Sequence, residues 1–245
     1  QDSGGKGPIV ILSHGFLMDH TMFDAQVAAL TPKYRVITWD ERGFGGTLAT
    51  GEFTYWDSAN DVLGLMDHLG IESAVIGGMS QGGFLSLRVA LTAPSRVKAL
   101  ILLDTQAGTE DPATVEPYNQ LHAAWIEHGA VAVQDVISSL ILGPGEWNDW
   151  FAKWGAMVPD QFTKAFHCLM HRDDVTSRLG EITCPALIVH GTADVAIPIE
   201  KAEVLRDRIA GPTTLVPIEG GPHAANMTHA EPVNKAIVQF LEALD

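Results

Sequence analysis

The sequence predicts an α/β fold, built on a mostly parallel sheet that helices cover on both faces. The chain has 245 residues, enough for one large domain with a sizeable buried core. Short apolar runs rich in β-branched residues alternate with helical patterns along the chain. Within these runs the apolar residues are continuous rather than alternating, as strands buried on both faces require.

Six runs have the length and composition of buried strands: residues 9–13, 36–39, 74–77, 99–103, 186–190 and 213–217. Four stretches have helical periodicity: residues 57–69, 81–92, 201–209 and 233–244. The chain shows no internal repeat. No apolar run approaches the roughly 20 residues that cross a bilayer, so a membrane protein is not expected.

The interval from about residue 109 to about residue 176 interrupts this alternation. It holds helical segments and no convincing strand, and proline and glycine divide it at Pro112, Pro117, Gly129, Gly143-Pro144-Gly145 and Pro159. An insertion of this length is too long to be a loop without secondary structure in a compact domain. We therefore expect a helical cap, residues 109–176, inserted after the strand that ends near Leu103. The core then consists of residues 1–108 and 177–245, and the cap lies at the carboxyl ends of its strands, where open α/β sheets bind ligands.

The charge of the chain argues against two classes of partner. Acidic side chains outnumber basic ones 30 to 15, giving a formal net charge of −15. Such a surface repels nucleic-acid phosphates and anionic membranes, so neither is expected as a partner. Neutral or cationic small molecules would approach more easily than anionic ones. The chain shows no signal-peptide pattern, and a cytoplasmic location is the default expectation.

The sharpest local motif is Gly78-Met79-Ser80-Gln81-Gly82, which joins a predicted strand to a predicted helix. That context suits a nucleophile elbow, in which a tight turn holds a serine in a strained backbone conformation. The glycines on either side let the strand and the helix approach closely. The serine hydroxyl then stands clear of the backbone, near the positive end of the helix dipole. Ser80 is therefore the candidate nucleophile, and a purely structural turn is the alternative.

A serine nucleophile needs a base, and ten histidines are available. His223 lies on a turn after the last predicted strand, at the same end of the sheet as Ser80, and is the candidate base. His229 is its main rival. His14 and His190 end predicted strands and precede glycines in turns, where structural roles are expected.

The base in turn needs a carboxylate that fixes its tautomer and stabilises the imidazolium. Asp194 follows a predicted strand through a tight turn and gives the chain order Ser, Asp, His. Asp104 also ends a predicted strand and is the alternative, with a loop-fixing role otherwise. For the oxyanion of the reaction, we expect two donors, the backbone N–H groups of Phe16 and Gln81.

Five segments together resemble the α/β-hydrolase family, in the branch of cap-bearing esterases, enol-lactonases and cofactor-free haloperoxidase-like enzymes. They occur in the family's order: Ser13-His14-Gly15-Phe16, Asp40-Glu41-Arg42-Gly43-Phe44-Gly45, Gly78-Met79-Ser80-Gln81-Gly82, His190-Gly191-Thr192-Ala193-Asp194 and Gly221-Pro222-His223. The resemblance implies a sheet flanked by helices, no cofactor and acyl transfer through a serine ester. Family members usually carry two antiparallel strands before the segment that here begins at Ile9. Only residues 1–8 precede it, so we expect those strands to be missing or trimmed.

A serine at the elbow distinguishes the chain from haloalkane dehalogenases and epoxide hydrolases of this fold, which use an aspartate there. The chain has no H-E-x-x-H motif, and no metal is expected.

Several apolar residues are candidates for a substrate pocket. Trp147, Trp150 and Trp154 recur at helical spacing in the expected cap. They either pack the cap onto the core or line an apolar pocket. Leu17 and Met79 lie beside the expected oxyanion loop and the nucleophile, where they would add to its wall.

These patterns predict a serine hydrolase that cleaves a small or medium carboxylic ester or lactone through an acyl-enzyme on Ser80. Two alternatives keep the triad and change the reaction: a cofactor-free perhydrolase or haloperoxidase-like enzyme, and a carbon–carbon bond hydrolase. A third is a ligand receptor built on a hydrolase scaffold.

Overall fold

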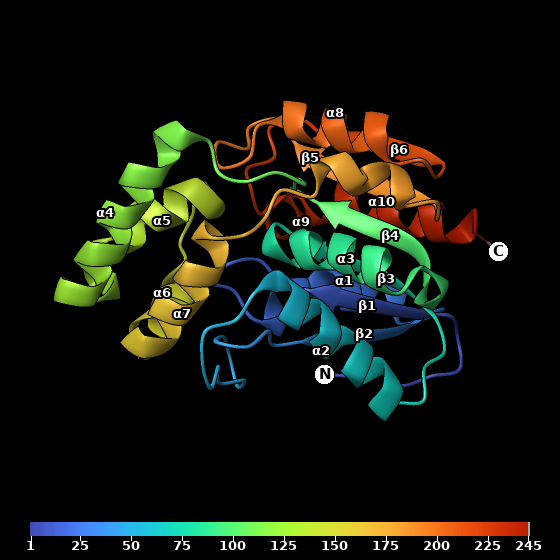
Figure 1. Ribbon diagram of the computed structural model, residues 1–245, viewed down its shortest axis with the longest axis horizontal. Coiled ribbons are helices and arrows are strands. Elements are labelled where there is room, and N and C mark those ends of the chain that lie inside the picture. Colours follow the sequence, from blue (N-terminus) through green and yellow to red (C-terminus); the bar gives the residue numbers. More distant parts are fainter. Residues whose placement is uncertain (245) are drawn as a thin grey trace.

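The computed structural model describes residues 1–244 and is organised around one six-stranded sheet (Figure 1). All strand pairs of this sheet are parallel, and the strand order is β2-β1-β3-β4-β5-β6. The strands are β1 Ile9–Ser13, β2 Arg35–Trp39, β3 Ala74–Met79, β4 Val97–Leu103, β5 Ala186–Gly191 and β6 Thr213–Ile218. The six expected strands are thus confirmed, with ends within two residues of the predicted ones.

The strand order reverses direction between β1 and β3. The chain runs from β1 outward to β2, then crosses to β3 on the other side of β1 and continues in that direction to β6. At such a switch point the loops after the two neighbouring strands leave in opposite directions and open a crevice at the carboxyl ends. The loop after β1 and the turn after β3 therefore border the place where a ligand is expected.

The strands β1, β3, β4 and β5 are almost entirely buried, as their continuous apolar runs predicted, whereas the edge strand β6 is mostly half-buried or exposed. In β1, Val10 and Leu12 pack into one hydrophobic cluster and Ile11 into the other, and all three are fully buried. The cluster around Ile11 includes residues of α2 Tyr55–His68, α3 Gln81–Thr92 and α8 Ile199–Arg208. The opposite cluster includes residues of α1 Asp24–Leu30 and α10 Ala230–Glu242.

Four of these helices correspond to the helical stretches expected from the sequence, and α1 does not. With seven residues, α1 is too short to show a clear periodicity. It is held in place by a buried side chain, because Gln26 donates hydrogen bonds of 2.8 Å to the Asn226 carbonyl and to Asn234 Oδ1. This contact spans some 200 positions of the sequence and cannot be seen in a local pattern.

No antiparallel strand belongs to the sheet formed by residues 1–244. Residues 1–3 instead run along β2 in an isolated antiparallel bridge between Asp2 and Ile37. The Ser3 N–H donates to the Val36 carbonyl at 2.9 Å, which holds this segment against the sheet edge.

Four helices lie between β4 and β5, where the insertion was expected: α4 Pro112–His128, α5 Gln134–Ile141, α6 Asn148–Ala156 and α7 Pro159–Met170. We call them the inserted helices. In Figure 1 they stand beyond the sheet, on the side to which the arrow of β4 points. Pro112 and Pro159 occupy first helical positions, where proline fits well. The expectation that Pro117 divides two helices is wrong, because it lies inside α4, which continues past the missing N–H.

Buried polar contacts join the inserted helices to the core. The Trp154 indole Nε1–H donates to the Leu17 carbonyl at 2.7 Å. The Gln161 side chain accepts from the Ala49 N–H at 2.7 Å and donates to the Ala49 carbonyl at 3.2 Å. Because a buried backbone group without a partner is costly, these bonds specify where the helices sit.

Among the described residues, no helix is long and apolar enough to cross a membrane.

Replacing Trp154 by phenylalanine tests the contact with the core. The substitution leaves the buried Leu17 carbonyl unpaired, and we expect a loss of about 1–2 kcal/mol of unfolding free energy. Urea unfolding measures the loss, and hydrogen exchange of residues 15–18 should become faster. Trp147→Phe is the matched control, because that indole bonds to the Gly143 carbonyl within the inserted segment. Equal hydrogen exchange of residues 15–18 in Trp154→Phe and Trp147→Phe would contradict the role given to the Trp154–Leu17 bond.

Candidate active site

The turn between β3 and α3 has the geometry of a nucleophile elbow. Ser80 adopts φ 53° and ψ −113°, which is unfavourable for a residue with a side chain. Its N–H donates to the Leu103 carbonyl at 2.9 Å, and its carbonyl accepts from Thr105 Oγ1 at 2.7 Å. A Cβ atom on Gly82 would lie 1.9 Å from the Ser13 carbonyl oxygen, so glycine is required there. The motif thus forms the elbow that its sequence context predicted.

Strained backbone is concentrated at this end of the sheet. Among residues 1–244, three non-glycine residues have a positive φ, and they are Leu17, Ser80 and Asp104 at 63°, 53° and 46°. They follow β1, β3 and β4, which are neighbours in the sheet. Such conformations persist only where the surrounding structure imposes them, and they are concentrated at functional sites.

His223 and Asp194 form a buried pair on the loops after β6 and β5. Asp194 Oδ2 lies 2.7 Å from His223 Nδ1, while Asp194 Oδ1 accepts 2.9 Å bonds from the N–H groups of Ala196 and Ile197. The carboxylate is therefore held from both sides. An Nδ1–H that points at Asp194 leaves the lone pair of His223 on Nε2, the arrangement that a general base needs.

The electrostatics of this pair favour an ionised carboxylate. Burial opposes the charge of Asp194, but His223 and the surrounding hydrogen bonds outweigh it and hold the pKa of Asp194 well below its usual range. Burial likewise lowers the pKa of His223, but the Asp194 carboxylate overcomes this and raises the pKa above the ordinary histidine value of about 6.5.

Ser80 and His223 line the same cavity. No hydrogen bond joins Ser80 Oγ to His223 among the described residues. Such bonds are often long in the absence of substrate and tighten when it binds. The structure thus brings the three proposed triad residues to one site, with His223 bonded to Asp194 and lining the same cavity as Ser80.

The rival residues Asp104 and His229 have other partners, whereas His190 also contacts Asp194, with Nε2 3.3 Å from Asp194 Oδ2. Asp104 Oδ1 accepts from the Gly191 N–H at 2.7 Å, and burial raises the pKa of this carboxyl to about 7. This contact fits the loop-fixing role, and His223 bonds to Asp194 rather than to Asp104. His229 bonds to Thr228 Oγ1 and is absent from the cavity wall. The buried ring of His190 lies 2.7 Å from the Ile197 carbonyl.

Two backbone N–H groups are available for an oxyanion. Within residues 1–244, neither Phe16 N–H nor Gln81 N–H takes part in a hydrogen bond. Gln81 opens α3, where the first N–H groups have no partner inside the helix. Phe16 belongs to a turn closed by the Met18 N–H on the Gly15 carbonyl at 3.1 Å, with the positive φ of Leu17 inside it. Both groups thus occupy the loops that border the switch point.

The cavity beside Ser80 has a volume of about 100 Å³ and mainly apolar walls. The core contributes Phe16, Leu17, Ser80, Phe84, Ala196, Ile197 and His223. The segment that carries the inserted helices contributes Glu110, Tyr118, Leu121, His122, Ile137, Leu140, Ile141, Phe162, Phe166 and Leu169. A substrate bound here would be enclosed by helices that the chain inserts between β4 and β5.

The pocket residues expected from the sequence need correction. Leu17 lines the cavity, but Met79, Trp147, Trp150 and Trp154 do not. The tryptophans lie on or before α6, which packs against the loop after β1, and Trp154 is bonded to that loop. The wall comes from α4, α5 and α7 instead. The apolar repeat of Phe162, Phe166 and Leu169 at helical spacing could have indicated α7.

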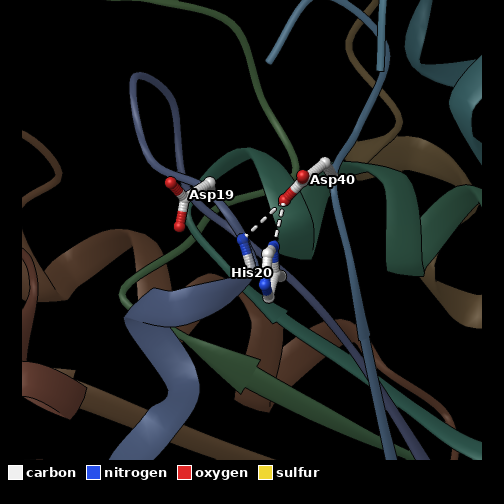
Figure 2. Close-up of side chains that lie close together, drawn as sticks. All are labelled: Asp19, His20 and Asp40. Carbon is white, nitrogen blue, oxygen red and sulfur yellow. Dashed lines mark hydrogen bonds and ion pairs between the residues drawn. The ribbon is translucent and has the colours of Figure 1, made fainter. Parts of the chain in front are cut away.

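A second cluster of ionisable side chains, Asp19, His20 and Asp40, lies outside the cavity wall (Figure 2). Asp40 Oδ1 accepts from the His20 N–H at 2.8 Å and lies 2.7 Å from His20 Nδ1. Asp40 Oδ2 accepts from the Gly46 N–H, and Asp19 pairs with Lys153 at 2.7 Å. These carboxylates are therefore occupied by protein donors, which fits a network that holds the loops after β1 and β2 together.

Comparisons with known proteins agree with this geometry. The family model described as the alpha/beta hydrolase fold matches residues 8–166, more than half of the chain, and the chain belongs to that family. An esterase from Thermogutta terrifontis superposes with a TM-score of 0.89 at 28% identity, covering 100% of this chain and 92% of that one. An enol-lactonase from Burkholderia xenovorans superposes with a TM-score of 0.90 at 26% identity, covering 99% and 95%.

A relative from Synechocystis, provisionally named a non-heme chloroperoxidase, is 28% identical, and the match covers 99% of this chain and 94% of the relative. The fold and the names of these relatives together support a hydrolase enzyme.

Sequence reasoning missed one buried acid close to the site. Glu41 is 1% exposed, and neither of its carboxyl oxygens has a hydrogen-bond partner of regular geometry among the described residues. Its N–H donates to His14 Nε2 at 3.0 Å. Burial raises the pKa of Glu41 to about 8, against weaker opposition from the nearby Ser58 and Gln81 side chains. The carboxyl therefore keeps its proton at neutral pH.

This shift predicts a pH dependence of stability. In the unfolded chain Glu41 ionises near pH 4.5, while the folded protein holds the proton up to about pH 8. The unfolding free energy therefore falls as pH rises through this interval. We expect Glu41→Gln to be within about 1 kcal/mol of the wild type at pH 5 and more stable by about 2–3 kcal/mol at pH 8. Urea unfolding at both pH values provides the measurement. If the unfolding free energies of the two proteins change equally with pH, the raised pKa of Glu41 is contradicted.

Proposed function

We propose that the protein hydrolyses small or medium carboxylic esters or lactones through an acyl-enzyme on Ser80. The observation that carries the proposal is that His223, whose Nδ1 lies 2.7 Å from Asp194 Oδ2, lines the same cavity as the elbow serine. The inserted helices act as the cap of this site, and the cap corresponds to residues 109–176. Esterase and enol-lactonase relatives with the same fold support this class of substrate.

In the first half of the reaction, Ser80 Oγ attacks the carbonyl carbon and His223 Nε2 takes the hydroxyl proton. The carbonyl oxygen becomes negative and is stabilised by the N–H groups of Phe16 and Gln81. Each such donor contributes roughly 3–4 kcal/mol to the transition state. The carbon–oxygen bond to the alcohol then breaks, and His223 returns the proton to the leaving oxygen.

In the second half, water takes the place of the alcohol. His223 removes a proton from the water, the resulting tetrahedral intermediate collapses, and the proton returns to Ser80 Oγ as the acid leaves. Asp194 stays ionised throughout and stabilises the imidazolium at each step. The cavity of about 100 Å³ favours a compact acyl or alcohol group, and its apolar walls disfavour a strongly hydrated one.

A perhydrolase activity is the second candidate, because one relative is provisionally named a chloroperoxidase. In that reaction hydrogen peroxide replaces water in the second half and yields a peracid. Peroxide-dependent halogenation of monochlorodimedone separates it from simple hydrolysis.

Ser80→Ala provides the first test of the mechanism. We expect p-nitrophenyl acetate and butyrate hydrolysis to survive excess chelator in the wild type and to fall by at least about 10³-fold in kcat in the variant. Ser139→Ala, an exposed serine on α5, is the matched control and should retain the wild-type rate. A rate that survives Ser80→Ala would exclude Ser80 as the nucleophile.

Because His223 must be neutral to act as the base, wild-type kcat/KM should decrease as pH falls, with a midpoint above the ordinary histidine value of about 6.5.

Asp194→Asn tests whether Asp194 is the carboxylate that orients His223. The substitution replaces the carboxylate that accepts the Nδ1–H by a neutral amide, and we expect kcat to fall about 10⁴-fold. Asp104→Asn is the control and should retain most of the activity. The reverse ranking of the two variants would assign the role to Asp104.

A further inference from the structure

The catalytic cavity carries a charge that acyl transfer does not require. Glu110 lines the cavity just before α4, and its Oε1 accepts from Arg172 Nη1 at 2.7 Å. The Arg172 side chain is 2% exposed, is not part of the wall, and also donates to the carbonyls of Gly108 and Leu169. The Glu110 carboxylate therefore faces the cavity, and the Arg172 guanidinium lies behind it.

Apart from Arg172, the neighbouring titratable groups do not offset the charge of Glu110. Burial, together with the carboxylates of Glu110 and Asp194, raises the pKa of Tyr118 to about 12, although Arg172 acts in the opposite direction. Burial lowers the pKa of His122, which leaves the ring neutral at pH 7. No lysine or arginine belongs to the described cavity wall, and His223 is paired with Asp194.

Aromatic rings complete this part of the cavity. The ring of His122 stacks on Phe166 with centroids 4.5 Å apart and lies 5.1 Å from Phe162. Phe16 lies 6.2 Å from Phe162. Electron-rich ring faces attract cations, and the attraction strengthens where water is excluded. A cavity lined by one carboxylate and by these rings is a suitable environment for an organic cation.

We propose that the cavity selects esters whose non-reacting portion carries a compact ammonium group, and that Glu110 is the specificity-determining residue. This inference rests on the proposed hydrolase function and narrows its substrate class. The formal net charge of −15 acts in the same direction, because it raises the local concentration of cationic substrates.

A pair of isosteric esters tests the proposal. Acetylcholine and 3,3-dimethylbutyl acetate have the same shape and differ in a charged nitrogen against a neutral carbon. We expect the wild type to favour acetylcholine about three- to tenfold in kcat/KM, as one partly compensated carboxylate and aromatic contacts allow. In Glu110→Gln, whose amide oxygen can still accept from Arg172, the ratio should fall to within about twofold of unity.

Glu116→Gln is the matched control, because it removes the same charge from an exposed position on α4 and should leave the ratio unchanged. Choline and 3,3-dimethylbutanol as competitive inhibitors of wild-type p-nitrophenyl butyrate hydrolysis give a readout that needs no variant. Choline should bind tighter by a similar factor.

The outcomes separate the inference from the function. If p-nitrophenyl butyrate is hydrolysed but the isosteres are treated equally, or if the preference persists in Glu110→Gln, the ammonium proposal is overturned and the esterase proposal stands. If the wild type hydrolyses no ester at all, the proposed function fails and the inference fails with it. If Glu116→Gln loses the preference for acetylcholine as fully as Glu110→Gln does, the preference comes from net charge, and the role of Glu110 is overturned.

Discussion

The close approach of β1 to α3 is the constraint on which the site depends. At Gly82 the helix backbone comes so near the Ser13 carbonyl that a single Cβ atom would collide with it. This contact places the start of α3 beside the loop after β1, so the N–H groups of Gln81 and Phe16 border one crevice. It also imposes the positive φ of Ser80, because the chain must reverse from strand to helix within one residue. The parallel sheet supplies the rigid frame that sustains this strain.

Buried carboxyl groups around this frame differ in their ionisation because their partners differ. Asp194 is surrounded by donors and stays ionised in spite of its burial. Glu41 has no hydrogen bond of regular geometry on its carboxyl group among the described residues, and keeps its proton at neutral pH. Asp104, with one donor on Oδ1, lies between these extremes. Burial favours the protonated form of all three, and the neighbouring charges and hydrogen bonds reverse this only at Asp194, whose pKa is lowered, while the pKa values of Asp104 and Glu41 are raised.

The inserted helices supply much of the cavity wall and are held against the core by buried hydrogen bonds. These bonds reach Leu17 on the loop after β1, beside Phe16, and Ala49 on the loop after β2. No residue of α6 lines the cavity, whereas α7 contributes both to docking and to the wall, because Gln161 bonds to Ala49 while Phe162, Phe166 and Leu169 line the cavity. Trp154→Phe can therefore act on the loop after β1 without changing the cavity wall.

Local patterns in the sequence predicted the strands, the elbow turn and the candidate triad, because continuous β-branched runs, paired glycines and acids at strand ends lie within a few residues of one another. The neighbours of Ser80, Asp194 and His223 in the chain were therefore sufficient to nominate them. Only the tertiary structure decided which wall faces the substrate, since Trp154 and Phe162 have equally helical surroundings and differ in the surface each helix meets. It also revealed α1 and the burial of Glu41. Those features depend on contacts between distant segments, such as Gln26 with Asn226, and the free energy of such contacts has no local signature in the chain.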